Sequence, residues 1–262
     1  MGESSSQQIK WFKTLGLGAL GGFVIALAWS LTAFWREMPA DEQTATPTTD
    51  QETVAQTADS ETVAPEAPTD LRDHQQHVSE VLADLDRDVL VANSPTQGNP
   101  EADIVVLKFS DFECPFCARA TAEVEAFLAD AGDEVLFVYK HLPLTQIHPE
   151  AIPAAQAAWA AQQQGQFWPY HDALFARQAE LGEDLYVEIA EELTLDMEQF
   201  NRDRISEGAN AAIAQDLALA QELQLTSTPT FLMGELLLPG VIPADLFSEA
   251  LVRLKAFYES QS

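Results

Sequence analysis

The feature that most constrains this chain is Cys114-Pro115-Phe116-Cys117, which contains both cysteines of the sequence. It follows an apolar run at 104–107 and precedes a helical pattern, so it lies where a strand passes into a helix. At such a junction the first sulfur lies beside unpaired helix N–H groups, whose partial positive charge favours thiolate over thiol. Pro115 suits the first helical turn, because its missing N–H leaves no hydrogen bond unmade there.

Two thiols at this spacing can form and reopen a disulfide, so the pattern indicates thiol–disulfide exchange by Cys114 and Cys117. The same spacing allows two other interpretations. A Cys-x-x-Cys pair is also half of many zinc sites, but those need further soft ligands and the chain has no third cysteine. A purely structural disulfide would close a very short loop and gain little chain entropy. We therefore expect a redox pair that uses neither a metal nor a cofactor.

Around this pair the chain resembles the DsbA-like thiol:disulfide oxidoreductases of bacterial envelopes, a family within the thioredoxin superfamily. The resemblance covers residues 88–258, and its blocks occur in the family's order. The blocks are Gly98-Asn99-Pro100-Glu101-Ala102, Phe109-Ser110-Asp111-Phe112-Glu113-Cys114-Pro115-Phe116-Cys117, His141-Leu142-Pro143-Leu144, Ile147-His148-Pro149, Gly165-Gln166-Phe167-Trp168-Pro169-Tyr170-His171-Asp172 and Thr228-Pro229-Thr230. The resemblance implies an α/β, thioredoxin-like fold with a helical insertion at about residues 149–223.

The resemblance also implies roles for single residues. Cys114 attacks or is attacked, and Cys117 resolves the mixed disulfide. Pro229 is expected to be a cis-proline facing the cysteines, and the backbone of Thr228 to pair with an extended substrate segment. An ordinary loop proline is the alternative. Pro115 and Phe116, between the two cysteines, are candidates for tuning the pair.

Lys108 departs from the family, in which a buried carboxylate commonly stands six positions before the first cysteine. On a strand covered on both faces, Lys108 is expected to point beneath the cysteine pair, where a cation favours thiolate and makes the disulfide more oxidising. The alternative is that Lys108 extends to the edge of the sheet and pairs with a surface carboxylate. The histidines of the family-like blocks are expected to pack or hydrogen-bond rather than catalyse; these are His141, His148 and His171.

Residues 88–262 are predicted to form the thioredoxin-like domain. Strands are expected at 88–92, 103–110, 135–140, 230–233 and 236–238. The second and third strands flank a helix at 115–130, so they should be parallel, whereas Gly234-Glu235 should turn the last two into a hairpin. The insertion shows breaks at Gly165, Gly182 and Leu195-Asp196, and a helix at 244–258 closes the domain.

The segment before the domain is expected to tether it to a membrane. Residues 14–35 contain no charged side chain, and their 22 positions span roughly 33 Å as a helix. Lys10 and Lys13 precede this run, which favours a short cytoplasmic tail at 1–13, a single-pass anchor at 14–36 and an exported remainder. A cleaved signal peptide is the alternative. An acidic linker rich in Thr, Pro and Ala at 37–70 is predicted to be disordered, and an accessory helix is predicted at 71–87.

The balance of 42 acidic against 13 basic residues, a net charge of −29, argues against a nucleic acid or an anionic membrane surface as partner. The expected function is disulfide donation to exported cysteine-containing proteins on the extracytoplasmic side, with a membrane quinone-linked thiol oxidase as electron acceptor. The alternatives are a thiol reductase or isomerase of the same fold, and a tethered substrate-binding or chaperone-like module without a redox role.

Overall fold

The computed structural model describes residues 69–261, and the chain divides into two units between Gln76 and His77. The cytoplasmic tail predicted at 1–13, the anchor at 14–36 and the linker up to residue 68 lie outside the described residues. Within 69–261, no helix combines the length and the apolar character needed to cross a membrane. The unit that begins at His77 contains the sheet and the cysteine pair, and the following paragraphs concern it.

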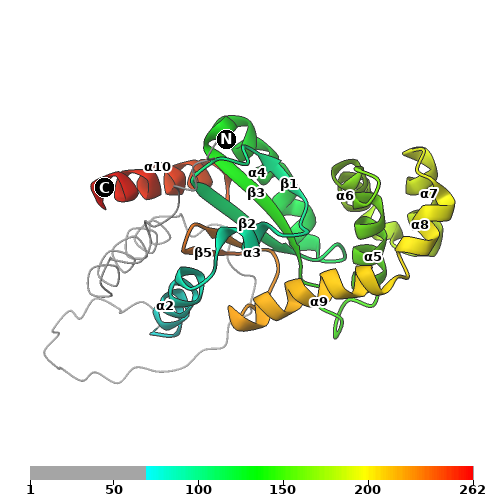
Figure 1. Ribbon diagram of the computed structural model, residues 1–262, viewed down its shortest axis with the longest axis horizontal. Helices are drawn as coiled ribbons and strands as arrows, with labels where there is room; N and C mark the ends of the chain where they lie inside the picture. The colour runs from blue at the N-terminus through cyan, green and yellow to red at the C-terminus, as the bar shows by residue number, and fades with distance from the viewer. Residues whose placement is uncertain (1–68, 262) are drawn as a thin grey trace, which may run out of the picture. The chain divides into compact units, whose positions relative to one another are not determined.

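A five-stranded sheet in the order β1-β3-β2-β4-β5 forms the centre of this unit (Figure 1). β2 and β3 are parallel, with Ile104 opposite Val135 and Ser110 opposite His141, and the other neighbours are antiparallel. The predicted parallel crossover and the final hairpin are therefore confirmed. The strands are β1 (Thr96–Gly98), β2 (Ile104–Ser110), β3 (Val135–His141), β4 (Thr230–Met233) and β5 (Leu236–Pro239).

Most of the helices lie between the strands in sequence. They are α2 (Thr69–Ala83), α3 (Arg87–Val91), α4 (Pro115–Ala131), α5 (Ala151–Gln162), α6 (Phe167–Ala176), α7 (Glu183–Glu192), α8 (Met197–Asp203), α9 (Glu207–Glu222) and α10 (Ala244–Gln261), with short 3-10 turns η2 (Gly132–Glu134) and η3 (Gln178–Glu180). The breaks predicted at Gly165, Gly182 and Leu195-Asp196 are confirmed. A further boundary separates α8 from α9, where the Ser206 side chain caps α9 by accepting from the N–H of Ala209 at 3.1 Å.

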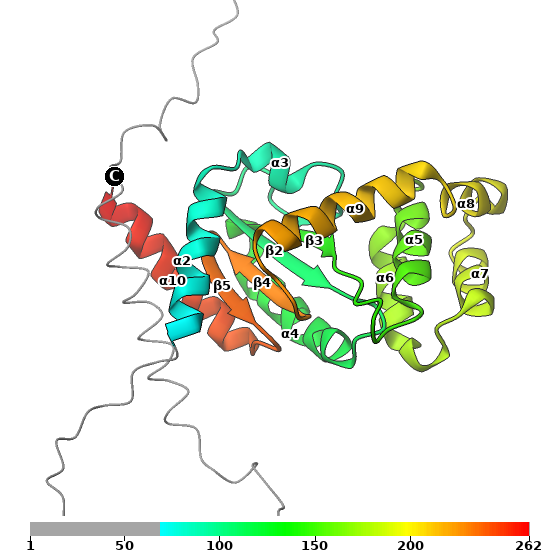
Figure 2. The same cartoon turned by 90° about the horizontal axis from the view of Figure 1, so that it is seen from below.

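Helices cover both faces of the sheet. α4 and α10 lie on one face, where Phe247 of α10 stacks on Phe127 of α4 at 5.1 Å and meets Phe231 of β4 at 4.9 Å (Figure 1). α9 crosses the other face (Figure 2). Its buried cluster joins residues of α2, β2, β3, α9 and β4, among them Val78, Leu82, Leu107, Phe109, Val138, Ala220 and Leu232. Because side chains alternate along a strand, Lys108 and Ser110 of β2 point to the opposite face, toward α4.

The helical insertion has its own core beyond the end of the sheet at which β2 and β3 finish (Figure 2). α5 is the central helix and contacts α6, α7, α8 and α9, which explains why it buries seven alanines and has no polar face. The same core includes Phe112, Cys114, Cys117 and Tyr139. The cysteine pair thus lies where the sheet meets the insertion.

The strand predicted at 88–92 is wrong, because these residues form helix α3. A short apolar run such as Val89-Leu90-Val91 does not distinguish a helix from a strand, and here Arg87 binds the carbonyl of Pro100 at 2.8 Å and so holds the helix against the following loop. The strand that pairs with the free edge of β3 is β1, a stretch for which no strand was predicted. The accessory helix predicted at 71–87 ends earlier, at Ala83.

Candidate active site

The cysteine pair lies where the sequence predicted it, at the junction of β2 and α4. Cys114 is the N-cap of α4, with extended backbone angles of φ −74° and ψ 120°, and Pro115 occupies the first turn. The Cys114 carbonyl accepts the N–H groups of Cys117 at 3.0 Å and Ala118 at 3.2 Å. The Cys114 sulfur is thereby placed at the helix N-terminus, where unpaired N–H groups stabilise negative charge.

The two thiols are free and differ in their ionisation. The pKa of Cys114 is lowered from 9.0 to about 5, chiefly because the Cys117 side chain donates a hydrogen bond to it. Backbone N–H groups of Cys117 and Phe116 lower it further, and burial opposes the shift. At neutral pH Cys114 is therefore a thiolate, the reactive form in disulfide exchange.

Cys117 has the opposite character. Its side chain is completely buried, and this burial, together with the hydrogen bond and the charge of Cys114, raises its pKa well above 9.0. The backbone N–H of Asp111 donates to the Cys117 sulfur at 3.5 Å. Cys117 is therefore a protonated inner thiol. Cys114, which is 3% exposed, is the outer one.

The loop before β4 faces the outer sulfur. The Thr228–Pro229 peptide bond is cis, as predicted. The Cys114 sulfur lies 3.3 Å from the carbonyl oxygen of Thr228, to which its protonated form donates a hydrogen bond. The loop is held by two bonds of its own, from Gly240 N–H to the Pro229 carbonyl at 2.8 Å and from the Thr230 hydroxyl to the Ser227 carbonyl at 2.8 Å.

The three candidate tuning residues lie in different surroundings. Pro115 starts α4, and Phe116 is half exposed next to Cys114, with the Arg119 guanidinium 4.6 Å from its ring centre. Lys108 is 1% exposed, and its amine lies 5.1 Å from the ring centre of Phe175 and 5.8 Å from that of Tyr139. Among the described residues no carboxylate lies within ion-pairing distance of Lys108. The pairing with a surface carboxylate, which was the alternative expectation for Lys108, is therefore not seen.

Asp111 anchors the turn between β2 and α4, and the sequence reasoning did not single it out. It is 2% exposed, and one carboxylate oxygen accepts from the N–H of Glu113 at 2.8 Å. The other accepts from the Leu144 N–H at 2.8 Å and lies 2.8 Å from Nδ1 of His148. His148 thus has the hydrogen-bonding role that was expected of it. These bonds tie the loop that follows β3 to the cysteine turn.

Gln178 in η3 of the insertion forms hydrogen bonds with this turn. The Gln178 side-chain amide donates to the carbonyls of Phe112 at 2.7 Å and Cys114 at 2.9 Å. In addition, the Glu113 carboxylate accepts from the N–H of Glu150, at the start of α5, at 2.6 Å. No motif in the sequence marks Gln178, because its partners lie 64 and 66 residues away and are backbone atoms.

His141 and His171 belong to an aromatic cluster behind the cysteines. Phe112 lies between them, with ring centres 6.1 Å from His141 and 5.8 Å from His171. Burial is the main cause that lowers the pKa of His141 from 6.5 to about 3 and that of His171 to about 4. Both imidazoles are therefore neutral packing groups at pH 7, in agreement with the sequence-based expectation.

A low-pKa thiolate at a helix N-terminus, a buried partner thiol and a cis-proline loop against the outer sulfur define a thioredoxin-like oxidoreductase. The family model described as thioredoxin matches residues 90–251, and the chain belongs to this family. A solved thioredoxin-like oxidoreductase from Silicibacter pomeroyi DSS-3 is 38% identical, with a TM-score of 0.61, and the match covers 66% of this chain and 99% of that one.

Two further relatives show how far the similarity extends. The thiol-disulfide exchange protein alpha-DsbA2 from Wolbachia pipientis has a TM-score of 0.62 over 72% of this chain and 100% of that one; at 17% identity it shows the fold alone. The Na(+)/H(+) antiporter NhaA 3 of Salinispora tropica is 39% identical over 156 residues, which are 60% of this chain and 24% of that protein. This chain thus spans about a quarter of the length of the curated relatives it matches.

Proposed function

We propose that this chain is a membrane-tethered thiol:disulfide oxidoreductase that donates the Cys114–Cys117 disulfide to exported proteins. The observation that carries the proposal is the pKa of Cys114, lowered to about 5 by the Cys117 hydrogen bond and the helix N–H groups. Interactions that stabilise the thiolate stabilise the reduced form of the pair. A disulfide whose reduced form is stabilised is a stronger oxidant, as donation requires.

The exchange proceeds in two steps. A substrate thiolate attacks the Cys114 sulfur, the bond to Cys117 breaks, and a mixed disulfide between substrate and Cys114 forms. A second substrate thiolate then attacks the substrate sulfur of this bond and releases Cys114 as a thiolate. Cys114 is a good leaving group in the second step because its pKa is low. The pair ends reduced and the substrate oxidised.

The surface around Cys114 supports binding of an unfolded substrate. The carbonyl of Thr228 lies against the Cys114 sulfur, so an extended segment that pairs with this backbone would bring its cysteine to the outer thiol. Phe116 offers an exposed aromatic ring next to the reacting sulfur, where it can contact apolar side chains of a chain that has not yet folded. The backbone contact is independent of substrate sequence, and the contact with Phe116 requires only an apolar side chain.

The proposed location rests on the segment before the domain. An uncharged run at 14–35, preceded by Lys10 and Lys13, favours insertion with the domain on the extracytoplasmic side, where disulfides persist. A flexible linker would let the domain reach its substrates near the membrane. Reoxidation of the pair by a membrane quinone-linked thiol oxidase would complete the cycle.

Stoichiometric reaction with a reduced, unfolded polypeptide tests this function. The oxidised protein should form disulfides in the polypeptide while its own cysteines become reduced, and Cys114→Ala should not. A chain that reduces insulin rapidly but oxidises the polypeptide poorly is a reductase instead. If the protein binds the polypeptide with unchanged affinity in Cys114→Ala and catalyses neither reaction, it is a binding module.

A further inference from the structure

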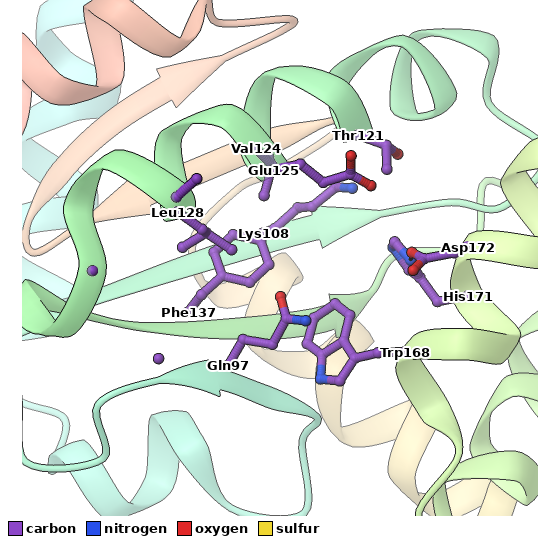
Figure 3. Close-up of a pocket in the computed structure, with 13 residues that line it drawn as sticks. Gln97, Lys108, Thr121, Val124, Glu125, Leu128, Phe137, Trp168, His171 and Asp172 are labelled. Carbon is purple, nitrogen blue, oxygen red and sulfur yellow. Dashed lines mark hydrogen bonds and ion pairs between the residues drawn. The ribbon is translucent and has the colours of Figure 1, made fainter.

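A crevice with a volume of about 440 Å³ lies between α4, α6 and the β1 edge of the sheet (Figure 3). This volume is within the range of small-molecule pockets in proteins, roughly 300–1,000 Å³. Neither Cys114 nor Cys117 lines the crevice, so it is distinct from the site of disulfide exchange. The exchange reaction described above gives it no role.

Part of the lining is apolar. It consists of Val124 and Leu128 of α4, Phe137 of β3 and Trp168 of α6 (Figure 3). The ring centres of Phe137 and Trp168 are 6.0 Å apart, and the indole N–H of Trp168 donates to the Thr96 carbonyl at 3.0 Å. Because the only polar group of the indole is already paired, the ring forms an apolar wall that can contact an apolar or aromatic group of a ligand.

The cation of the crevice is Lys108, which extends into it from β2 (Figure 3). Lys108 is 1% exposed, and its amine lies 5.1 Å from the ring centre of Phe175 and 5.8 Å from that of Tyr139. Within residues 69–261 it forms neither an ion pair nor a hydrogen bond. Aromatic faces attract a cation, but they do not replace the acceptors that its three N–H donors have in water. A ligand carboxylate would supply this missing acceptor.

Two carboxylates lie at the margin of the crevice. Glu125 of α4 and Asp172 of α6 are both exposed and line it from different helices (Figure 3). One oxygen of Asp172 lies 2.7 Å from Nδ1 of His171, a ring that its lowered pKa of about 4 keeps neutral at pH 7. Neither carboxylate forms an ion pair with a lysine or arginine of the described part of the chain. The margin therefore attracts an ammonium group and repels a simple anion.

We propose that this crevice binds a zwitterionic α-amino acid with an apolar side chain. The ligand carboxylate pairs with Lys108, and the ligand ammonium group lies toward Glu125 and Asp172. The apolar side chain contacts the rings of Phe137 and Trp168. A simple carboxylic acid would meet the repulsion of two carboxylates, whereas an amine would leave the buried cation without an acceptor. Only a ligand that carries both charges beside an apolar group satisfies all three parts of the lining.

Calorimetric titration of the purified full chain at pH 7 with four compounds tests this pattern. L-phenylalanine has both charges and an apolar side chain, whereas 3-phenylpropanoate lacks the ammonium group, 2-phenylethylamine lacks the carboxylate and glycine lacks the side chain. L-phenylalanine should bind at one site per chain. Each of the other three should bind at least about tenfold more weakly, because each loses one set of contacts. If L-phenylalanine does not bind, or if 3-phenylpropanoate binds equally well, the proposal is overturned.

Variants at the two charged ends locate the ligand. Lys108→Met removes the cation and should weaken binding of L-phenylalanine at least about tenfold, without weakening that of 2-phenylethylamine. The double variant Glu125→Gln, Asp172→Asn changes only exposed residues and so guards against a folding artefact. It should weaken binding of L-phenylalanine but not that of 3-phenylpropanoate. Lys255→Met, on α10, is the matched control and should bind L-phenylalanine like the wild type. Unchanged affinity for L-phenylalanine in Lys108→Met or in the double variant would place the amino acid elsewhere and overturn the proposal.

Discussion

The Cys114 sulfur lies 3.3 Å from the carbonyl oxygen of Thr228, which joins the start of α4 to the cis-proline loop across 114 residues of sequence. The contact sets the outer thiol against the backbone edge at which an extended substrate would lie. Cys117, by contrast, faces the interior core of the insertion and is fully buried. The two cysteines therefore have different access to a substrate.

This difference predicts which variant traps substrates. Cys117→Ala should accumulate mixed disulfides through Cys114, because the outer thiolate still attacks disulfides of other proteins and the inner thiol that would release the adduct is missing. Non-reducing gels of cells that express the variant measure this, with Cys114→Ala as the matched control. Adducts that form on Cys114→Ala but not on Cys117→Ala would show that the roles are reversed.

Removing the charge beneath the cysteines should weaken the oxidant. Lys108→Glu places a negative charge where a cation now acts on both sulfurs, so the pKa of Cys114 should rise and the reduction potential should fall by tens of millivolts, given that about 30 mV corresponds to 1.4 kcal/mol. Titration in glutathione buffers measures the potential. Lys255→Glu, at a partly exposed position of α10 where the lysine pairs with Glu134, makes the same change of net charge far from the site and should leave the potential unchanged. A potential that stays constant or rises in Lys108→Glu contradicts the electrostatic role.

Gln178 should stabilise the active-site turn. Gln178→Ala removes the donor to the carbonyls of Phe112 and Cys114, and the loss should lower the free energy of unfolding by about 1–3 kcal/mol. Urea unfolding of the reduced protein measures the change. Gln221→Ala, at an exposed position of α9, is the control and should change stability little. Equal stability of the two variants would mean that the hydrogen bonds from Gln178 to the turn contribute nothing to the free energy of unfolding.

Acid should destabilise the domain through its buried histidines. In the unfolded chain His141 and His171 take up protons near pH 6.5, whereas burial lowers the folded-state pKa to about 3 and about 4. The unfolded state therefore binds more protons, and stability is lost as pH falls from 6.5 to about 4, by about 1.4 kcal/mol per pH unit for each histidine. His171→Phe, which keeps an aromatic ring in the cluster, should make this slope shallower by about one proton. An unchanged slope would contradict a neutral, buried His171.

The parts of the fold that could be predicted from sequence are those with local signals. The apolar run of β2, the Cys-Pro-Phe-Cys turn and the helix that follows lie next to one another, so the strand, the helix start and the thiolate position follow from neighbouring residues. The cis bond at Pro229 was predicted from the family resemblance alone. In α3 the local signal was ambiguous, and contacts from Arg87 to the loop after β1 decided in favour of helix.

The supporting residues of the site could not be predicted, because each depends on contacts distant in sequence. The role of Asp111 depends on the loop after β3, which brings Leu144 and His148 to its carboxylate. Gln178 binds backbone carbonyls, which leave no signature in the sequence of their own residues. For Lys108, the pattern left open whether the side chain points beneath the cysteine pair or extends to the edge of the sheet. Its lack of an ion-pair partner within residues 69–261 depends on the packing of α4 and α6 around it.

The redox state of Cys114 and Cys117 in living cells tests the central claim, disulfide donation, most directly. Cells that express the full chain are quenched in acid, their free thiols are alkylated with a mass tag, and the fraction of protein without the tag is read on a gel. A disulfide donor that is continually reoxidised by a thiol oxidase should be found mostly in the disulfide form. A pair that is mostly reduced under normal growth would contradict donation and would identify the protein as a reductase.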